Sequence, residues 1–288
     1  MKNVIPLWCW LIILVIISFI LLLSGYLIKT PHDAFLSWGL KRLNTTNTNV
    51  ITVGTSLVRH GFYFDQSFDS FAKTKGLNDI KLIRFTKPLA KPEDIDTVLT
   101  TIQSNPNHIK LLLIQLEPYM FYNPKELNYF YTLQNNFHTF IKKISDNLHI
   151  TTFHSHYETD TNINLYRSSS YEKIKSLLKD KNTLKQFKTP NISSSDHILL
   201  KNLQNSGVNI VFIQMNYAKE TYQFLLPNHL NQQIQQWISQ FQKNTGYPVW
   251  QFPSLNASYY TDTAHLNYKG RKLFSTWVIS KIKSKGLV

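Results

Sequence analysis

The sequence predicts an α/β domain in which helices cover both faces of a parallel sheet. Two observations support this prediction: five short runs rich in apolar and β-branched residues, and stretches of helical apolar spacing between several of them. Strands that are apolar almost throughout are typical of a parallel sheet, because both of its faces are buried. The five strand candidates are residues 50–53, 80–85, 109–116, 208–215 and 248–252.

Four segments between and after these runs have apolar residues three and four positions apart, the spacing of an amphipathic helix. Alternation of such helices with strands predicts a layered α/β architecture, with ligands bound at the carboxyl ends of the strands. The predicted helices are residues 94–104, 127–148, 230–244 and 266–282.

The amino-terminal region predicts a transmembrane anchor at residues 1–29. Residues 5–28 carry no charged side chain, and 24 helical residues span about 36 Å, enough to cross a bilayer with some tilt. Trp8, Trp10 and Tyr26 are placed like interfacial aromatic residues. A cleaved signal peptide is the alternative; its apolar core is usually shorter and ends at a small-residue site. The length therefore favours an uncleaved anchor.

Residues 30–47 are predicted to be a juxtamembrane linker. Their apolar side chains among Lys41 and Arg42 suit either a helix on the bilayer surface or one packed on the domain. Lys2 on one side of the apolar span, and Lys29 with these two residues on the other, leave the membrane orientation open by the positive-inside rule.

The formal net charge of +14 favours an anionic partner. A phospholipid surface or an acidic polymer fits better than nucleic acid, because the predicted anchor would tether the chain and no nucleic-acid motif is present. Cys9 is the single cysteine, so neither a disulfide framework nor a thiolate metal site is predicted.

The rest of the chain, residues 48–288, is predicted to be one catalytic domain with an insertion at 151–200. The insertion is polar and rich in turn residues. A long segment at the binding edge of a sheet is often a lid or a substrate platform. A plain surface loop is the alternative.

Three side chains are candidates for a catalytic triad. Ser56 follows the first predicted strand, and Asp262 and His265 stand three positions apart just before the last predicted helix. A serine hydroxyl is a weak nucleophile until a base removes its proton, and a carboxylate can orient the histidine that does so. Helix capping by the serine and the aspartate is the structural alternative.

This pair of motifs resembles the SGNH (GDSL-like) hydrolase superfamily. The resemblance covers residues 48–285 and depends on Gly54-Thr55-Ser56 and on Asp262-x-x-His265, continued by Leu266-Asn267-x-x-Gly270. It implies a three-layer α/β/α sandwich with a five-stranded, flavodoxin-like parallel sheet. It also implies that Ser56 is the nucleophile, His265 the base and Asp262 its orienter, with no cofactor and no metal.

The resemblance further implies an oxyanion hole, whose usual glycine and asparagine are absent here. The donor candidates are the backbone amide of Ser56 or Leu57, the backbone amide of Thr86 or Lys87, and the side chain of Gln115. Arg59 and His60, one helical turn after the serine, are candidates for substrate binding. His154 and His156 alternate as metal ligands can, but no partner ligand stands at a fixed spacing, and no metal site is predicted.

The function implied by the resemblance is that of a membrane-anchored serine acyltransferase or esterase, with acetyl as the expected acyl group. The expected substrate is cell-envelope carbohydrate or another acylated small molecule, and the expected location is the outer side of a bacterial cytoplasmic membrane. A multi-pass membrane acyltransferase is an expected partner. An inactive scaffold in an envelope assembly complex and a lipid esterase are the alternatives.

Overall fold

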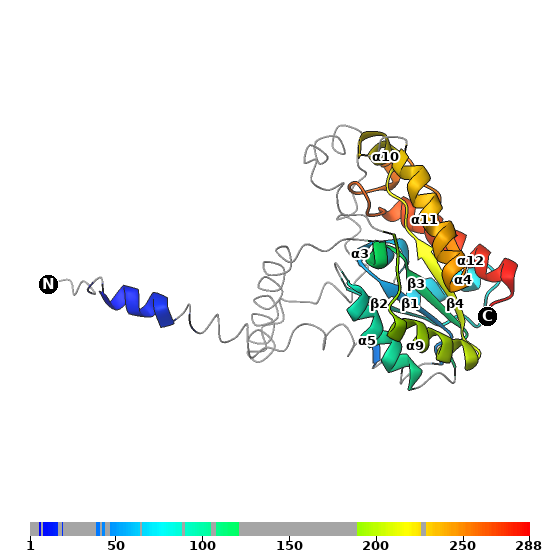
Figure 1. Ribbon diagram of the computed structural model, residues 1–288, viewed down its shortest axis with the longest axis horizontal. Coiled ribbons are helices and arrows are strands. Elements are labelled where there is room, and N and C mark those ends of the chain that lie inside the picture. Colours follow the sequence, from blue (N-terminus) through cyan, green and yellow to red (C-terminus); the bar gives the residue numbers. More distant parts are fainter. Residues whose placement is uncertain are drawn as a thin grey trace. The chain divides into compact units, whose positions relative to one another are not determined.

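The computed structural model (Figure 1) describes residues 6, 8–16, 19, 39–40, 42–43, 47–63, 65–87, 90–104, 108–120, 189–225 and 229–288. The chain divides into two compact units. One consists of residues 1–34 and 123–158, and the other of residues 35–122 and 159–288.

In the first unit, residues 8–16 are helical and their apolar side chains are exposed. Trp8, Trp10 and Leu14 expose 62%, 55% and 64% of their surface. Among the residues described, no helix has both the length and the apolar character needed to cross a membrane. Most of the predicted span at 5–28 lies outside the described residues.

The second unit is built on a five-stranded parallel sheet in the order β2-β1-β3-β4-β5. This is the flavodoxin-like order that the resemblance implied, and the predicted α/β sandwich is confirmed. Strand order reverses between β1 and β3, and a doubly wound sheet binds its ligands at the carboxyl ends of the strands there. The strands are β1 (Val50–Gly54), β2 (Leu82–Thr86), β3 (Leu111–Gln115), β4 (Asn209–Gln214) and β5 (Val249–Gln251).

Helices cover both faces of the sheet because both faces are apolar. One core joins the sheet to α5 (Pro92–Gln103), α9 (Ser194–Asn205) and α11 (His229–Thr245). The other joins it to α3 (Ser56–Gly61), α4 (Asp65–Thr74) and α12 (Tyr268–Lys285). Short elements complete the unit at the carboxyl ends of the strands: α6 (Glu117–Met120), α10 (Lys219–Leu225) and the 3-10 helix η3 (Ala257–Tyr259).

The predicted strands all exist, and each differs from its predicted range by one or two residues at an end. Apolar residues continue past the last ladder bond, so hydrophobicity alone overextends a strand. The helix α4 has no counterpart among the predictions, because its core contacts come from only a few residues such as Phe68 and Ala72. The predicted helix 127–148 lies outside the described residues. The predicted insertion 151–200 ends inside α9, which covers the sheet before β4.

Candidate active site

The predicted nucleophile, Ser56, is the first residue of α3, directly after β1. Thr55 caps this helix: its side-chain oxygen accepts a hydrogen bond from the Leu57 amide at 3.2 Å. The tight turn from strand to helix therefore holds the serine at the carboxyl end of β1. The first turn of a helix also presents N–H groups without intrahelical partners, which suits a developing negative charge.

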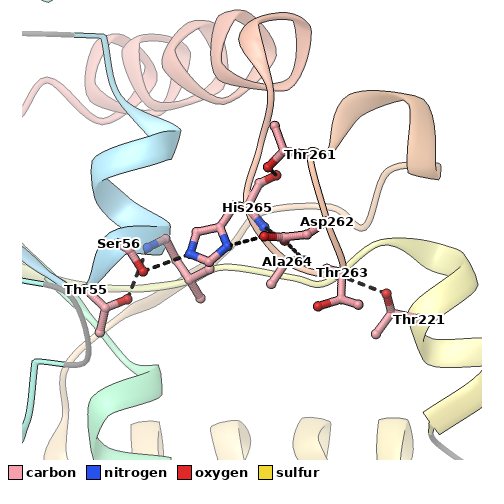
Figure 2. Close-up of polar contacts among 9 residues, drawn as sticks. Thr55, Ser56, Thr221, Thr261, Asp262, Thr263, Ala264 and His265 are labelled. Carbon is pink, nitrogen blue, oxygen red and sulfur yellow. Dashed lines mark hydrogen bonds and ion pairs between the residues drawn. The ribbon is translucent and has the colours of Figure 1, made fainter. Parts of the chain in front are cut away.

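The three predicted triad residues lie in series (Figure 2). The Oγ of Ser56 is 2.8 Å from Nε2 of His265, and Nδ1 of that ring is 2.8 Å from Oδ2 of Asp262. Because an ionised carboxylate can only accept, Nδ1 carries the proton and Nε2 accepts from the serine hydroxyl. The structure thus brings together residues 209 positions apart in the tautomer that a general base requires.

The loop that carries the aspartate and the histidine is held by hydrogen bonds to its own backbone groups. Oδ1 of Asp262 accepts from the amides of Ala264 and His265, each at 2.8 Å. The amide of Thr261 closes the loop onto the carbonyl of His265 at 2.8 Å. From α10, the Thr221 hydroxyl donates to the Thr263 carbonyl at 3.0 Å. The N-cap of the last helix, α12, is Asn267 and not Asp262, so the capping alternative for the aspartate is wrong.

Electrostatics keep the aspartate ionised. Burial by itself would raise the pKa of Asp262, but the hydrogen bond and charge of His265 and the two backbone amides outweigh burial and hold the pKa at about 2. The side chains of His265 and Asp262 remain 28% and 37% exposed. The Asp262 carboxylate is therefore ionised, as stabilisation of a protonated His265 ring requires, and both side chains are partly exposed to solvent.

His60 lies beside the triad, with its ring centroid 4.8 Å from that of His265. Burial lowers its pKa to about 3, and the positive groups of His265, Arg271 and Arg59 add to this effect, with Asp262 opposing it. His60 is therefore neutral at physiological pH. His60, one of the two predicted substrate-binding residues, therefore contacts the base.

The oxyanion candidates are not equally placed. The Leu57 amide is engaged by Thr55, as described above. The Lys87 amide donates to the Gly54 carbonyl of β1 at 3.0 Å. Because only alternate amides of a parallel strand face the same neighbouring strand, the Thr86 amide points away from β1. The Leu57 amide is thus already bonded to Thr55, and the Thr86 amide points away from the strand that leads to Ser56.

Gln115 has a different role from the one predicted. Its Oε1 accepts from the Thr55 amide at 2.6 Å and from the Thr55 hydroxyl at 2.9 Å, which ties the end of β3 to the turn before Ser56. These donors determine which end of the amide is oxygen. The Nε2 atom is buried. Gln115 therefore stabilises the turn that precedes the nucleophile.

Two arginines that the sequence analysis did not select hold the far end of α3. Arg84, on β2, donates from Nη1 to the carbonyls of Arg59 and Phe62 at 3.2 and 3.3 Å. Arg271, 4% exposed on α12, donates from Nε to the His60 carbonyl at 3.2 Å. Cations at a helix carboxyl end satisfy its unpaired carbonyls and its dipole. An arginine inside an apolar strand was the available signal for Arg84.

Glu117 is a further buried titratable group near this edge of the sheet. It is 3% exposed, and its Oε1 accepts from the Met215 amide just after β4. Burial raises the pKa of Glu117 to about 8, against the lowering effect of backbone amides and of the Gln115 side chain. Across the described part of the chain, no group of three or more His, Cys, Asp or Glu could hold a metal ion.

Comparison with solved structures gave matches of low sequence identity. No protein-family model matches the chain, and no curated protein does. A GDSL-like lipase from Bacteroides thetaiotaomicron is 8% identical with a TM-score of 0.41, covering 88% of this chain and 98% of that one. The acetyl xylan esterase AlAXEase is 12% identical with a TM-score of 0.42, covering 81% of this chain and 99% of that one.

The chain's own geometry agrees with the resemblance stated from its motifs. The serine follows the first strand, the Asp-x-x-His block precedes the last helix, and the sheet has the order 2-1-3-4-5. In sheet order and in the arrangement of Ser56, Asp262 and His265, the chain agrees with what the SGNH (GDSL-like) resemblance implied.

Proposed function

We propose that the protein is a membrane-anchored serine esterase or O-acyltransferase that acts on cell-envelope carbohydrate. The observation that carries the proposal is the unbroken series from the Ser56 hydroxyl through His265 to Asp262, with both contacts at 2.8 Å. A serine within hydrogen-bond reach of an oriented histidine is the arrangement that nucleophilic catalysis needs.

In the acylation step, Ser56 Oγ attacks the carbonyl carbon of an ester while His265 Nε2 takes the hydroxyl proton. The positive ring that results is stabilised by the ionised carboxylate of Asp262. The tetrahedral intermediate then collapses, the bond to the leaving alcohol breaks, and His265 returns the proton to that alcohol. The product is an acyl ester on Ser56.

In the second step, His265 removes a proton from an acceptor hydroxyl, whose oxygen attacks the carbonyl carbon of the acyl-serine. The bond from the acyl group to Ser56 Oγ then breaks, and His265 returns the proton to Oγ. Water as acceptor gives hydrolysis, and a sugar hydroxyl gives transfer. The same residues serve both outcomes, so the proposal covers an esterase and an O-acyltransferase. Acetyl is the proposed acyl group on the basis of the motif resemblance.

The anchor and the location are part of the proposal. The uncharged run at 5–28 and the exposed apolar side chains of residues 8–16 support insertion in a membrane. We place the domain on the outer face of a bacterial cytoplasmic membrane, where a multi-pass acyltransferase could supply acyl groups. Reporter fusions after Lys29 and at the carboxyl terminus test this. Activity of a cytoplasm-dependent reporter at both positions contradicts it.

The covalent step is tested with a serine-directed phosphonate probe on the full chain in detergent. Labelling should occur at Ser56, be abolished by Ser56→Ala, and fall by several orders of magnitude in His265→Ala. Ser258→Ala is the matched control, because Ser258 is exposed and is not part of the triad. This variant should label as the wild type does. Folded wild-type protein that neither labels nor cleaves any small ester would favour the inactive scaffold.

A further inference from the structure

The charges of the catalytic domain are unevenly distributed between the amino-terminal and the carboxyl-terminal ends of the strands of its sheet. In a parallel sheet all strands begin at one edge, and the helices that precede them end there. Lysines gather at this edge, here called the basic edge. Its lysines are Lys73, Lys75, Lys81, Lys110, Lys243, Lys281, Lys283 and Lys285, and all except the half-buried Lys281 are exposed.

These lysines come from five segments, which are the ends of α4, α11 and α12 and the residues just before β2 and β3. A side-chain carbon at Gly76, after α4, would lie 3.5 Å from Nζ of Lys283 on α12. The amide of Lys110 donates to the Asn49 carbonyl at 2.9 Å, and the Asn49 side chain donates to the Asp79 carbonyl at 2.6 Å. The ends of α4 and α12 and the starts of β1 and β3 therefore form one continuous edge.

Few negative groups compensate this edge. Among the described residues, its acidic side chains are Asp79 and Asp69, and Asp69 is 3.9 Å from Lys81. Helix dipoles favour a lysine in a last turn, which explains some of these residues. It does not explain Lys75, Lys81 and Lys110, which lie outside the helices.

The opposite edge, which carries the triad, has charges of both signs. Lys87 pairs with Asp94 at 2.7 Å, and Asp262 pairs with His265. Glu220 follows Lys219 at the start of α10. The net positive charge is thus concentrated on the side of the domain that faces away from the catalytic serine.

Strand β1 begins at the basic edge. Residues 48 and 49 lead into β1, and Asn49 is bonded to the segment before β2.

We propose that the basic edge docks on an anionic phospholipid bilayer, so that the triad faces away from the membrane. Basic residues close to an anionic leaflet are attracted within a Debye length of its surface. The lysines spread over the ends of several elements rather than lining a groove, which suits a planar surface better than a single polymer chain. The inference depends on the anchor part of the proposed function and is independent of the triad's chemistry.

Docking restricts the substrate. With the basic edge on the lipid headgroups, Ser56 stands at the far end of the strands, and a headgroup of the same leaflet cannot reach it. The acyl acceptor is then a molecule that extends away from the bilayer, such as a glycan. A lipid esterase would need the opposite orientation, with the triad facing the headgroups.

The test measures energy transfer from a labelled cysteine to an acceptor lipid, with the full chain in nanodiscs. In a Cys9→Ser background, Ser284→Cys reports on the basic edge and Ser258→Cys on the triad edge; both native serines are exposed. The two positions lie near opposite ends of α12, whose 18 residues span about 27 Å. In discs with anionic lipid, the label at 284 should transfer more efficiently than the label at 258.

The controls separate charge from tethering. Replacement of Lys281, Lys283 and Lys285 by Gln should abolish the difference between the labels, whereas the same loss of charge at Lys219, Lys269 and Lys272 should leave it. Neutral discs, or 1 M salt with a Debye length of about 3 Å, should also abolish it. Equal transfer from both labels in anionic discs, greater transfer from 258, or a chain that does not join the discs overturns the proposal.

Discussion

Replacement of Asp262 by asparagine tests the catalytic geometry most directly, because the structure determines how the new side chain will lie. Oδ1 of Asp262 accepts two backbone N–H groups, from Ala264 and His265. An asparagine must keep its oxygen at that position, since an NH₂ group cannot accept. Its NH₂ group is then directed at Nδ1 of His265, where Oδ2 stood 2.8 Å away.

The consequence is a change of tautomer in the base. An NH₂ group donates to Nδ1, so the ring proton moves to Nε2, and Nε2 can no longer accept from Ser56. We expect kcat/KM for a small ester to fall by about 10⁴, as wrong-tautomer substitutions in triads do. That factor corresponds to about 5 kcal/mol of lost transition-state stabilisation.

The assay compares initial rates for p-nitrophenyl acetate with thermal unfolding of the same preparations. Asp262→Asn should unfold like the wild type, because both amide contacts of Oδ1 are retained. Asp262→Ala removes the acceptor as well, so it should also lose about 1–2 kcal/mol of stability. An Asp262→Asn protein whose rate stays within tenfold of the wild type would refute the tautomer argument.

Two further predictions concern buried groups beneath the site. Gln115→Leu leaves the Thr55 amide buried without its acceptor, so we expect a loss of about 1–3 kcal/mol in unfolding free energy together with reduced activity. Gln214→Leu is the matched control at the end of β4; its Oε1 has no partner, so a neutral or stabilising effect is expected, and equal losses in both variants would contradict the support role. For Glu117, the folded pKa of about 8 exceeds the ordinary value of 4.5, so the folded state holds an extra proton between these values and stability falls as pH rises through that window. In Glu117→Gln the unfolding temperature should lose this decline between pH 5 and pH 8, and an unchanged slope would contradict the assignment.

Much of the fold could be predicted from the sequence, because its signals are local. Each buried strand is an apolar run, and the helices α5, α11 and α12 repeat apolar residues at helical spacing. Their existence follows from the need to bury those residues. The residues at which the strands end cannot be predicted from hydrophobicity, because apolar residues such as Leu116 and Met215 stay buried beyond the last pair of the ladder.

The triad residues could also be selected from the sequence, because chemistry restricts the choice. A serine after the first strand and an Asp-x-x-His block before the last helix are recognisable as short patterns. The pattern does not contain the distance between them. That distance depends on the order of the strands in the sheet and on the loop that lies across its edge from β5.

Only the tertiary structure decided how the site is supported and what surrounds it. Gln115 looked like an oxyanion donor by its position after a strand, yet its oxygen holds the Thr55 turn. Arg84 and Arg271 hold the end of α3 from elements 25 and 211 residues away. The lysines of the basic edge are scattered in the sequence and meet because parallel strands begin together. Strand runs, helix spacing and motif residues are properties of neighbours in the chain and can be read from it, whereas partners, distances and charged surfaces arise when distant segments pack.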